Sequence, residues 1–283
     1  MNTLLLLSVV TGVVLQSTSQ KQYNKRNKGG IYIFNAVCPL CACLIFLLSS
    51  IKGFGFDKAL IPYILTFAVS YGSAILFTFL AVREGSLSLT SLATSYSLII
   101  PTLYGIFFLN ETPDIFIYTG FAFLVLSLFL INSKKEDAKI NLKWIIFIVI
   151  AFLGNGMCSV IQTAQQLHFG GNYKGEFMIL ALLAVSVFFF ILSLLKEKTQ
   201  ILPSLKSNAV FMIITGLANG IANLFVMILI SRKMEASIMF PIISGGGIIL
   251  TCAVSVIFFK EKLSLKQYIG LILGVTSVIL MNI

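Results

Sequence analysis

Apolar residues form long unbroken runs in this chain, and charged residues are concentrated in the short stretches between them. Residues 181–195 include no charged side chain, whereas 133–141 include Lys134, Lys135, Glu136, Asp137 and Lys139. A helix of about 20 residues crosses a hydrocarbon core of about 30 Å, so the pattern predicts an all-α, polytopic membrane protein. The ten predicted spans are 2–20, 29–51, 59–81, 87–109, 114–132, 142–166, 176–195, 208–230, 235–259 and 264–282.

Composition supports this interpretation, because 58% hydrophobic residues, 11% charged residues and a mean hydropathy of +1.00 exclude a soluble domain with a wet surface. The net charge of +10 is spread over short loops that flank the spans. No soluble domain is left to present a groove to nucleic acid, so we expect no nucleic-acid partner. Anionic headgroups of membrane lipids are the expected partners of these basic residues.

The end of the chain repeats an internal segment, because 233–282 overlies 83–132 without a gap at a shift of 150 positions. Sparse residue types keep this register, including the pairs Glu111/Glu261, Tyr118/Tyr268 and Gly120/Gly270. The sequence therefore predicts a first five-helix repeat at 1–132, a linker loop at 133–141 and a second five-helix repeat at 142–283. Five crossings are an odd number, so the second repeat would enter the membrane from the opposite side, as inverted-topology repeats do.

Two five-helix halves, each with a Glu shortly before its last span and a Tyr-x-Gly inside that span, resemble the drug/metabolite transporter superfamily, specifically its EamA-type ten-helix members. The resemblance covers essentially the whole chain. It implies a carrier for a small solute, with a central cavity lined by the first, third and fourth helices of each half. The related four-helix small multidrug resistance family typically carries an acid in its first helix, and this chain departs from that pattern because spans 1 and 6 lack one.

Basic residues also bear on orientation in the cell membrane. Loops after odd-numbered spans hold fifteen Lys and Arg residues, and loops after even-numbered spans hold five. Both termini lie on one side, and the positive-inside rule places that side outside. The family resemblance implies cytoplasmic termini instead, so absolute orientation stays open.

Residues for catalysis or for a cofactor do not gather in this sequence. Asp57, Asp114 and Asp137 fall in loops, and the single histidine, His168, ends a span. The cysteines, including Cys38 and Cys41, are interpreted as small packing residues because no histidine lies near them in the sequence. We therefore expect no enzyme activity, no metal and no cofactor.

Polar side chains inside the spans are the candidate solute ligands. They recur at helical spacing on one face of several spans, which separates them from lipid. A buried amide without partners costs about 2–7 kcal/mol, so amides in the central spans indicate a hydrated cavity or a polar ligand. The alternative is that these groups only hold helices together. The candidate substrate-binding residues are Gln16, Tyr71, Thr94, Ser97, Asn155, Ser159, Gln162, Asn219, Asn223 and Ser244.

These patterns predict a secondary transporter that moves a small neutral or zwitterionic metabolite or drug-like solute by alternating access. A non-transporting scaffold or receptor-like protein and a gated channel are the alternatives. One chain holds both repeats, so a monomer should suffice, while a dimer and a coupling proton or ion stay open. Glu111 and Glu261 lie just beyond spans 4 and 9, where a carboxylate can bond helix-terminal donors such as the start of the next span, and we expect a structural role for both.

Overall fold

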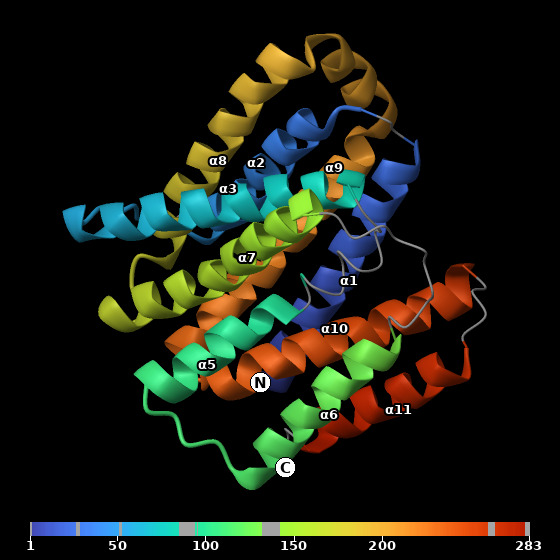
Figure 1. The fold of residues 1–283 in the computed structure, drawn as a ribbon. Helices are drawn as coiled ribbons and strands as arrows, with labels where there is room; N and C mark the ends of the chain where they lie inside the picture. The colour runs from blue at the N-terminus through green and yellow to red at the C-terminus, as the bar shows by residue number, and fades with distance from the viewer. Residues whose placement is uncertain are drawn as a thin grey trace. The chain divides into compact units, whose positions relative to one another are not determined.

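The computed structural model describes residues 2–26, 29–50, 53–84, 94, 96–131, 142–259 and 264–280. All regular secondary structure in these ranges is helical, which confirms the all-α part of the predicted fold class (Figure 1). The α-helices are α1 (Asn2–Arg26), α2 (Ile31–Ser49), α3 (Ile61–Glu84), α5 (Ile99–Phe108), α6 (Ile115–Ile131), α7 (Leu142–His168), α8 (Lys174–Lys196), α9 (Lys198–Ser231), α10 (Ala236–Phe259) and α11 (Leu265–Leu280), and the 3-10 helices are η1 (Lys58–Leu60) and η2 (Tyr96–Leu98).

Helix length agrees with a multi-pass membrane protein. Among the described residues, six helices are long and apolar enough to cross a membrane, and four shorter apolar helices accompany them. One clear difference from the predicted spans is α9, which begins at Lys198 rather than near 208. The hydrophobic pattern marks only the part of a helix that faces lipid, whereas backbone hydrogen bonds continue the helix through the polar residues before it.

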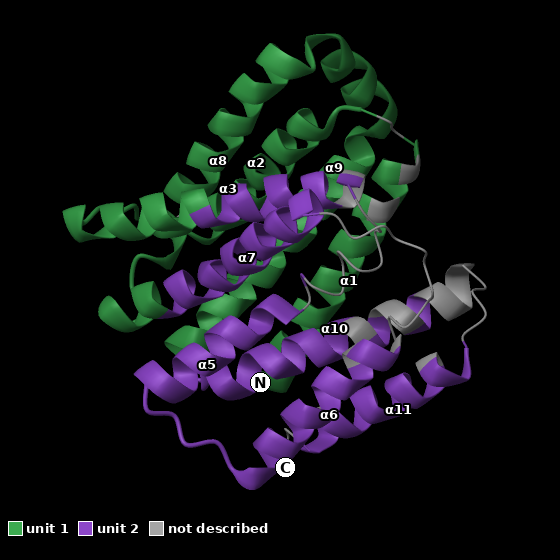
Figure 2. Cartoon of the chain, in the orientation of Figure 1, with its two compact units in different colours: residues 1–69, 164–232 green, residues 70–163, 233–283 purple. Residues whose placement is uncertain are grey.

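The chain forms two compact units (Figure 2). Unit 1 comprises 1–69 and 164–232, and unit 2 comprises 70–163 and 233–283. Each unit therefore combines helices from both halves of the sequence. The assignment of 1–132 and 142–283 as repeats, joined by the linker at 133–141, stays a prediction, and the linker lies outside the described residues.

In unit 1, α9 packs between α1 and α2 through two rows of small residues. A β-carbon on Gly216 would lie 2.5 Å from the carbonyl oxygen of Cys38, and one on Gly220 would lie 2.9 Å from Ala42 of α2. On the other side, a β-carbon on Gly12 of α1 would lie 3.2 Å from Ala222. Small residues four apart let membrane helices approach closely, so this spacing fixes α9 against both neighbours.

Helices α2 and α8 of unit 1 run antiparallel. The hydroxyl of Ser186, near the middle of α8, donates over 2.8 Å to the carbonyl oxygen of Ala36 in the second turn of α2. Beyond the C-terminal end of α2, Ser50 lies against Gly175 in the first turn of α8. The hydrogen bond thus joins two residues that are 150 positions apart in the sequence.

In unit 2, two further helix pairs run antiparallel. Ser127 near the end of α6 donates through its hydroxyl to the carbonyl oxygen of Gly270 near the start of α11, over 2.5 Å. Glu111, just after α5, accepts from the first backbone amides of α10. The C-terminal end of each first helix therefore meets the N-terminal end of its partner.

Candidate functional site

Asn155 of α7 is the centre of a polar cluster in unit 2. Its side-chain nitrogen Nδ2 donates to Ser97 Oγ over 2.5 Å, and Ser97 Oγ donates to the carbonyl oxygen of Thr94 over 2.6 Å. Ser97 is fully buried, whereas Asn155 and Thr94 are half-buried. Two helical segments that are about 60 residues apart in sequence thus share one hydrogen-bonded chain, which we call the Asn155 cluster (Thr94, Ser97 and Asn155).

Two glycines beside Asn155 explain why α7 comes so near to its neighbours. A β-carbon on Gly154 would lie 2.7 Å from the carbonyl oxygen of Ser70 in α3. A β-carbon on Gly156 would lie 2.7 Å from the carbonyl oxygen of Ser97. The two glycines therefore let the α7 backbone approach the backbone of two neighbouring segments closely. The Asn155 side chain lies between these two contacts.

The other predicted site residues of unit 2 differ in how far they are buried. Gln162 is 3% exposed and Ser244 is 9% exposed, while Ser159 and Tyr71 are half-buried. The carbonyl oxygen of Ser159 accepts from Thr163 Oγ1 over 2.9 Å. Asn155, Ser159 and Gln162 follow one another at helical spacing along α7, as the sequence predicted.

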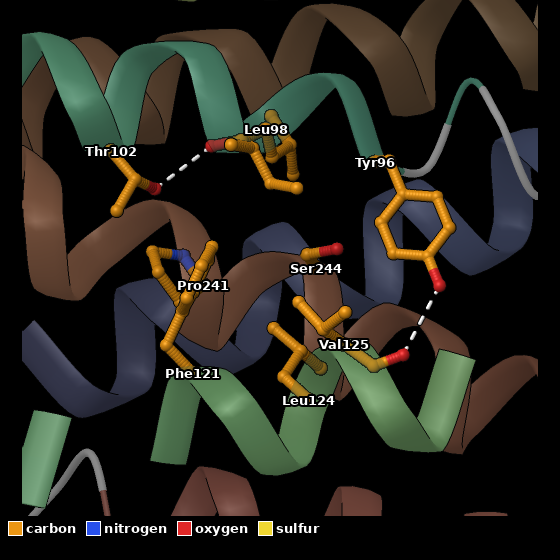
Figure 3. Close-up of a pocket in the computed structure, with 9 residues that line it drawn as sticks. Tyr96, Leu98, Thr102, Phe121, Leu124, Val125, Pro241 and Ser244 are labelled. Atoms are coloured by element: carbon orange, nitrogen blue, oxygen red, sulfur yellow. Dashed lines mark hydrogen bonds between the residues drawn. The ribbon is translucent and has the colours of Figure 1, made fainter. Parts of the chain in front are cut away.

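Ser244 lines a small pocket in unit 2 (Figure 3). Its free volume is about 10 Å³, which is roughly the space that one water needs. The polar groups around it are occupied, because Tyr96 donates to the carbonyl oxygen of Val125 and Thr102 donates to that of Leu98. We therefore interpret this pocket as a packing defect and not as the place of a solute.

Three amides of unit 1 form a second chain, which we call the amide chain (Gln16, Asn219 and Asn223). Asn219 Nδ2 of α9 donates to Gln16 Oε1 of α1 over 3.2 Å. Asn223 Nδ2 donates to the backbone carbonyl oxygen of Asn219 over 2.9 Å. Gln16 and Asn223, at the two ends of the amide chain, are half-buried, so part of each of these residues is accessible from outside unit 1.

Neither cluster contains an ionisable side chain, so neither supplies a fixed countercharge. Glu84, Glu176 and Glu235 lie outside both clusters. Glu176 Oε1 accepts from the backbone amide of Gly55 over 3.1 Å, and Glu84 and Glu235 are exposed. The two clusters therefore offer directional donors and acceptors to a polar group without net charge.

Glu111 has the structural position that the sequence predicted, but with a different partner. Its carboxylate accepts from Ala236 N over 3.0 Å and from Ser237 N over 2.8 Å, which caps α10 and not the following helix α6. The chain turns back because Asn110 has a left-handed backbone with φ of 55°. Glu261, its counterpart at a shift of 150, lies outside the described residues.

Several buried polar groups were absent from the list of candidate site residues. Asn208 Oδ1, Thr215 Oγ1 and Gln166 Oε1 are buried and have no hydrogen-bond partner among the described residues. Asn208 and Thr215 lie on the face of α9 that also carries Asn219, at helical spacing. This periodicity was the signal that could have identified them from the sequence.

The described cysteines pack inside unit 1 and unit 2. Cys38, Cys41, Cys43 and Cys158 are buried and unpaired by disulfides. The Cys38 thiol lies 3.4 Å from the carbonyl oxygen of Met212, across the contact between α2 and α9. In the described ranges, no group of three His, Cys, Asp or Glu side chains is arranged to hold a metal ion.

Comparison with solved proteins places the fold. A crystal structure described only as "Crystal structure of protein" superimposes with a TM-score of 0.81 at 14% sequence identity. The alignment covers 99% of this chain and 98% of that chain. This chain shares that fold. No curated protein matches the sequence.

Comparison with protein families gives a partial match. The family described as "Small Multidrug Resistance protein" matches residues 203–273. These residues run from Pro203 in α9 through α10 to Leu273 in α11. The matched segment is about a quarter of the chain, and it carries Asn219, Asn223 and Ser244.

Proposed function

We propose that this protein is a secondary transporter of the EamA type within the drug/metabolite transporter superfamily. The observation that carries the proposal is the match of 203–273 to the family of Small Multidrug Resistance proteins, because that segment carries two amides of the amide chain. A transporter, and not an enzyme, is the function that this match favours.

Inverted repeats are part of the proposal, and the helix pairs support them. A shift near 150 residues relates five pairs of described helices, and three of them, α2 with α8, α5 with α10 and α6 with α11, are in contact. All three pairs run antiparallel, as counterparts related by a twofold axis in the membrane plane would. The hydrogen bond from Ser186 to Ala36 joins two residues separated by this same shift.

The solute that we propose is small, polar and either neutral or zwitterionic. The Asn155 cluster and the amide chain offer amide and hydroxyl groups only. Desolvating a bare ion against neutral groups costs more than a few hydrogen bonds of about 0.5–1.5 kcal/mol return. A zwitterion or a neutral solute can use donors and acceptors together without a buried countercharge.

Transport by purified protein in proteoliposomes tests the function. A panel of radiolabelled zwitterionic amino acids, nucleobases, sugars and organic cations is offered, and initial uptake is measured against concentration. We expect saturable uptake of at least one zwitterionic or neutral solute and counterflow when the vesicles are preloaded with the same unlabelled solute. Flux that does not saturate would indicate a channel, and absence of flux over the whole panel would favour a scaffold.

Paired variants assign the binding groups. Asn155→Ala and Asn223→Ala should each raise the apparent KM because a buried hydrogen-bonding group is lost. Ser8→Ala is the matched control, since the hydroxyl of this half-buried residue bonds the carbonyl oxygen of Leu4 in its own helix. Equal kinetics of all three variants would contradict the assignment of these residues.

A further inference from the structure

The contact between α1 and α9 in unit 1 changes character along its length. At one end, Gly12 packs tightly against Ala218 and Ala222. Beyond the pair of Gln16 and Asn219, α1 and α9 carry the buried polar residues Ser19 and Thr215, and the fully buried Tyr23 of α1 follows before the turn between α1 and α2. Two groups on this part of α9, Asn208 Oδ1 and Thr215 Oγ1, are buried without partners. We call this polar part of the α1–α9 contact the seam.

The helix register shows what lies opposite these groups. Asn219 pairs with Gln16, and α1 runs antiparallel to α9 because Asn2 at the start of α1 contacts Arg232 after the end of α9. One turn further along each helix, this register sets Ser19 of α1 opposite Thr215. Ser19 is 6% exposed and Thr215 is 3% exposed, so by this register the seam has one buried hydroxyl residue on each helix.

Thr215 differs from other helical threonines of this protein. Thr11, Thr66, Thr102 and Thr163 each donate to the carbonyl oxygen four residues earlier, which is the usual way to satisfy a hydroxyl in an apolar helix. The Thr215 hydroxyl makes no such bond. Its buried oxygen therefore needs a partner from outside its own helix.

The buried side chain of Asn208 also needs a hydrogen-bond partner from outside its own helix. Its Nδ2 donates to Ser207 Oγ over 2.6 Å, which leaves Oδ1 without a donor. Exchanging the two ends of the amide would only leave the nitrogen unpaired instead. Water satisfies either end, because it can donate and accept.

The end of the seam is covered by a turn that only glycine fits. Gly30 has a left-handed φ of 76°, and its carbonyl oxygen accepts from the Tyr23 hydroxyl over 2.6 Å. Ser204 of α9 lies directly against Gly30, so a β-carbon there would collide with it. This turn follows span 1 and belongs to the side of the membrane that carries most of the basic loops.

We propose that the seam is a water-binding passage, which opens at the Gly30 turn and ends at the pair of Gln16 and Asn219. In this conformation the buried Tyr23 side chain, bonded to Gly30, closes the passage, and Asn208 Oδ1 and Thr215 Oγ1 remain without hydrogen-bond partners, which costs free energy. When the passage opens, water can form hydrogen bonds with Asn208 and Thr215. Water then reaches the amide chain from one side only, because the tight contact of Gly12 with Ala222 closes the other end of the passage. The inference rests on the proposed function, since it gives the solute a hydrated approach to the amide chain.

Cysteine accessibility tests the passage. Ser19→Cys and Thr215→Cys are treated, in membrane vesicles of defined sidedness, with a small charged methanethiosulfonate, and peptide mass spectrometry identifies the modified thiol. Met227→Cys is the control on the same helix, because Met227 is fully buried and lies away from the seam by helical spacing. Native Cys43, which is 1% exposed, is an internal reference in every sample.

We expect both seam thiols to react about tenfold or more faster than the Met227→Cys thiol, because buried thiols are inert and hydrated ones are reactive. The reaction should occur only from the side of the Gly30 turn. Equal rates at the seam and at the control would overturn the passage. Solute flux without seam labelling would overturn this inference alone, whereas labelling without flux would overturn the proposed function alone.

Thr215→Val gives an independent readout that does not need a cysteine. Removing an unpaired hydroxyl should favour the closed seam, so the thermal midpoint should rise and labelling of Ser19→Cys should slow. Thr102→Val is the matched control, because Thr102 is equally buried and its hydroxyl is bonded. A lower midpoint for Thr215→Val, as for the control, would show that its hydroxyl is satisfied and would overturn the proposal.

Discussion

Glu111 allows a direct test of how α10 is held in unit 2. The carboxylate accepts two backbone hydrogen bonds, of 3.0 and 2.8 Å, from Ala236 and Ser237. Hydrogen bonds to a charged group contribute about 1.5–3 kcal/mol each, and partial exposure of Glu111 favours the lower figure. A glutamine at this position keeps one acceptor and loses the charge. We therefore expect Glu111→Gln to destabilise the protein by about 2 kcal/mol and Glu111→Ala by about 3 kcal/mol.

The matched control is Glu235→Gln, because this exposed acid precedes the same helix by one residue and its side chain makes no hydrogen bond within the part of the chain that the structure describes. Removing that charge should lower the free energy of unfolding by less than about 1 kcal/mol, because only its interaction with the helix dipole is lost. Unfolding in mixed detergent micelles measures the three variants, and uptake by the surviving protein measures affinity. Equal stability of Glu111→Gln and Glu235→Gln would refute the capping argument. A large loss of solute affinity without loss of stability would place Glu111 in the binding site.

Other contacts lead to further measurable outcomes. Ser186→Ala should lower unfolding free energy by about 0.6–2 kcal/mol, because it removes the bond to Ala36, and unfolding in detergent measures this. Gly216→Leu should abolish recovery of folded protein in size-exclusion chromatography, because its side chain would meet the backbone of Cys38. Gln162→Ala should raise KM while the yield of folded protein is retained, and loss of both would indicate a purely structural amide. Solute affinity should change by less than about twofold between pH 5.5 and 7, since the two clusters hold no ionisable group.

Sequence patterns did not predict which residues far apart in the sequence become partners in the structure. The sequence predicted that Glu111 bonds the donors of a helix end, and this holds, but the helix is α10, more than 120 residues away. Periodicity placed Asn155 and Asn219 on polar helix faces without indicating that Ser97 and Gln16 are their partners. A helix face is a local property of a 3.6-residue repeat, whereas a partner depends on how separate helices pack.

The sequence by itself determined the solvent, the fold class and the approximate ends of the helices. Lipid offers no hydrogen bonds, so an apolar run of about 20 residues has to become a helix wherever it lies in the chain. Tertiary structure alone decided that the compact units mix the two sequence halves and that α9 packs through Gly216 and Gly220 on one side and Ala218 and Ala222 on the other. It also decided which polar groups stay unpaired, because satisfaction of Asn208 or Thr215 depends on the atoms that a neighbouring helix brings to them.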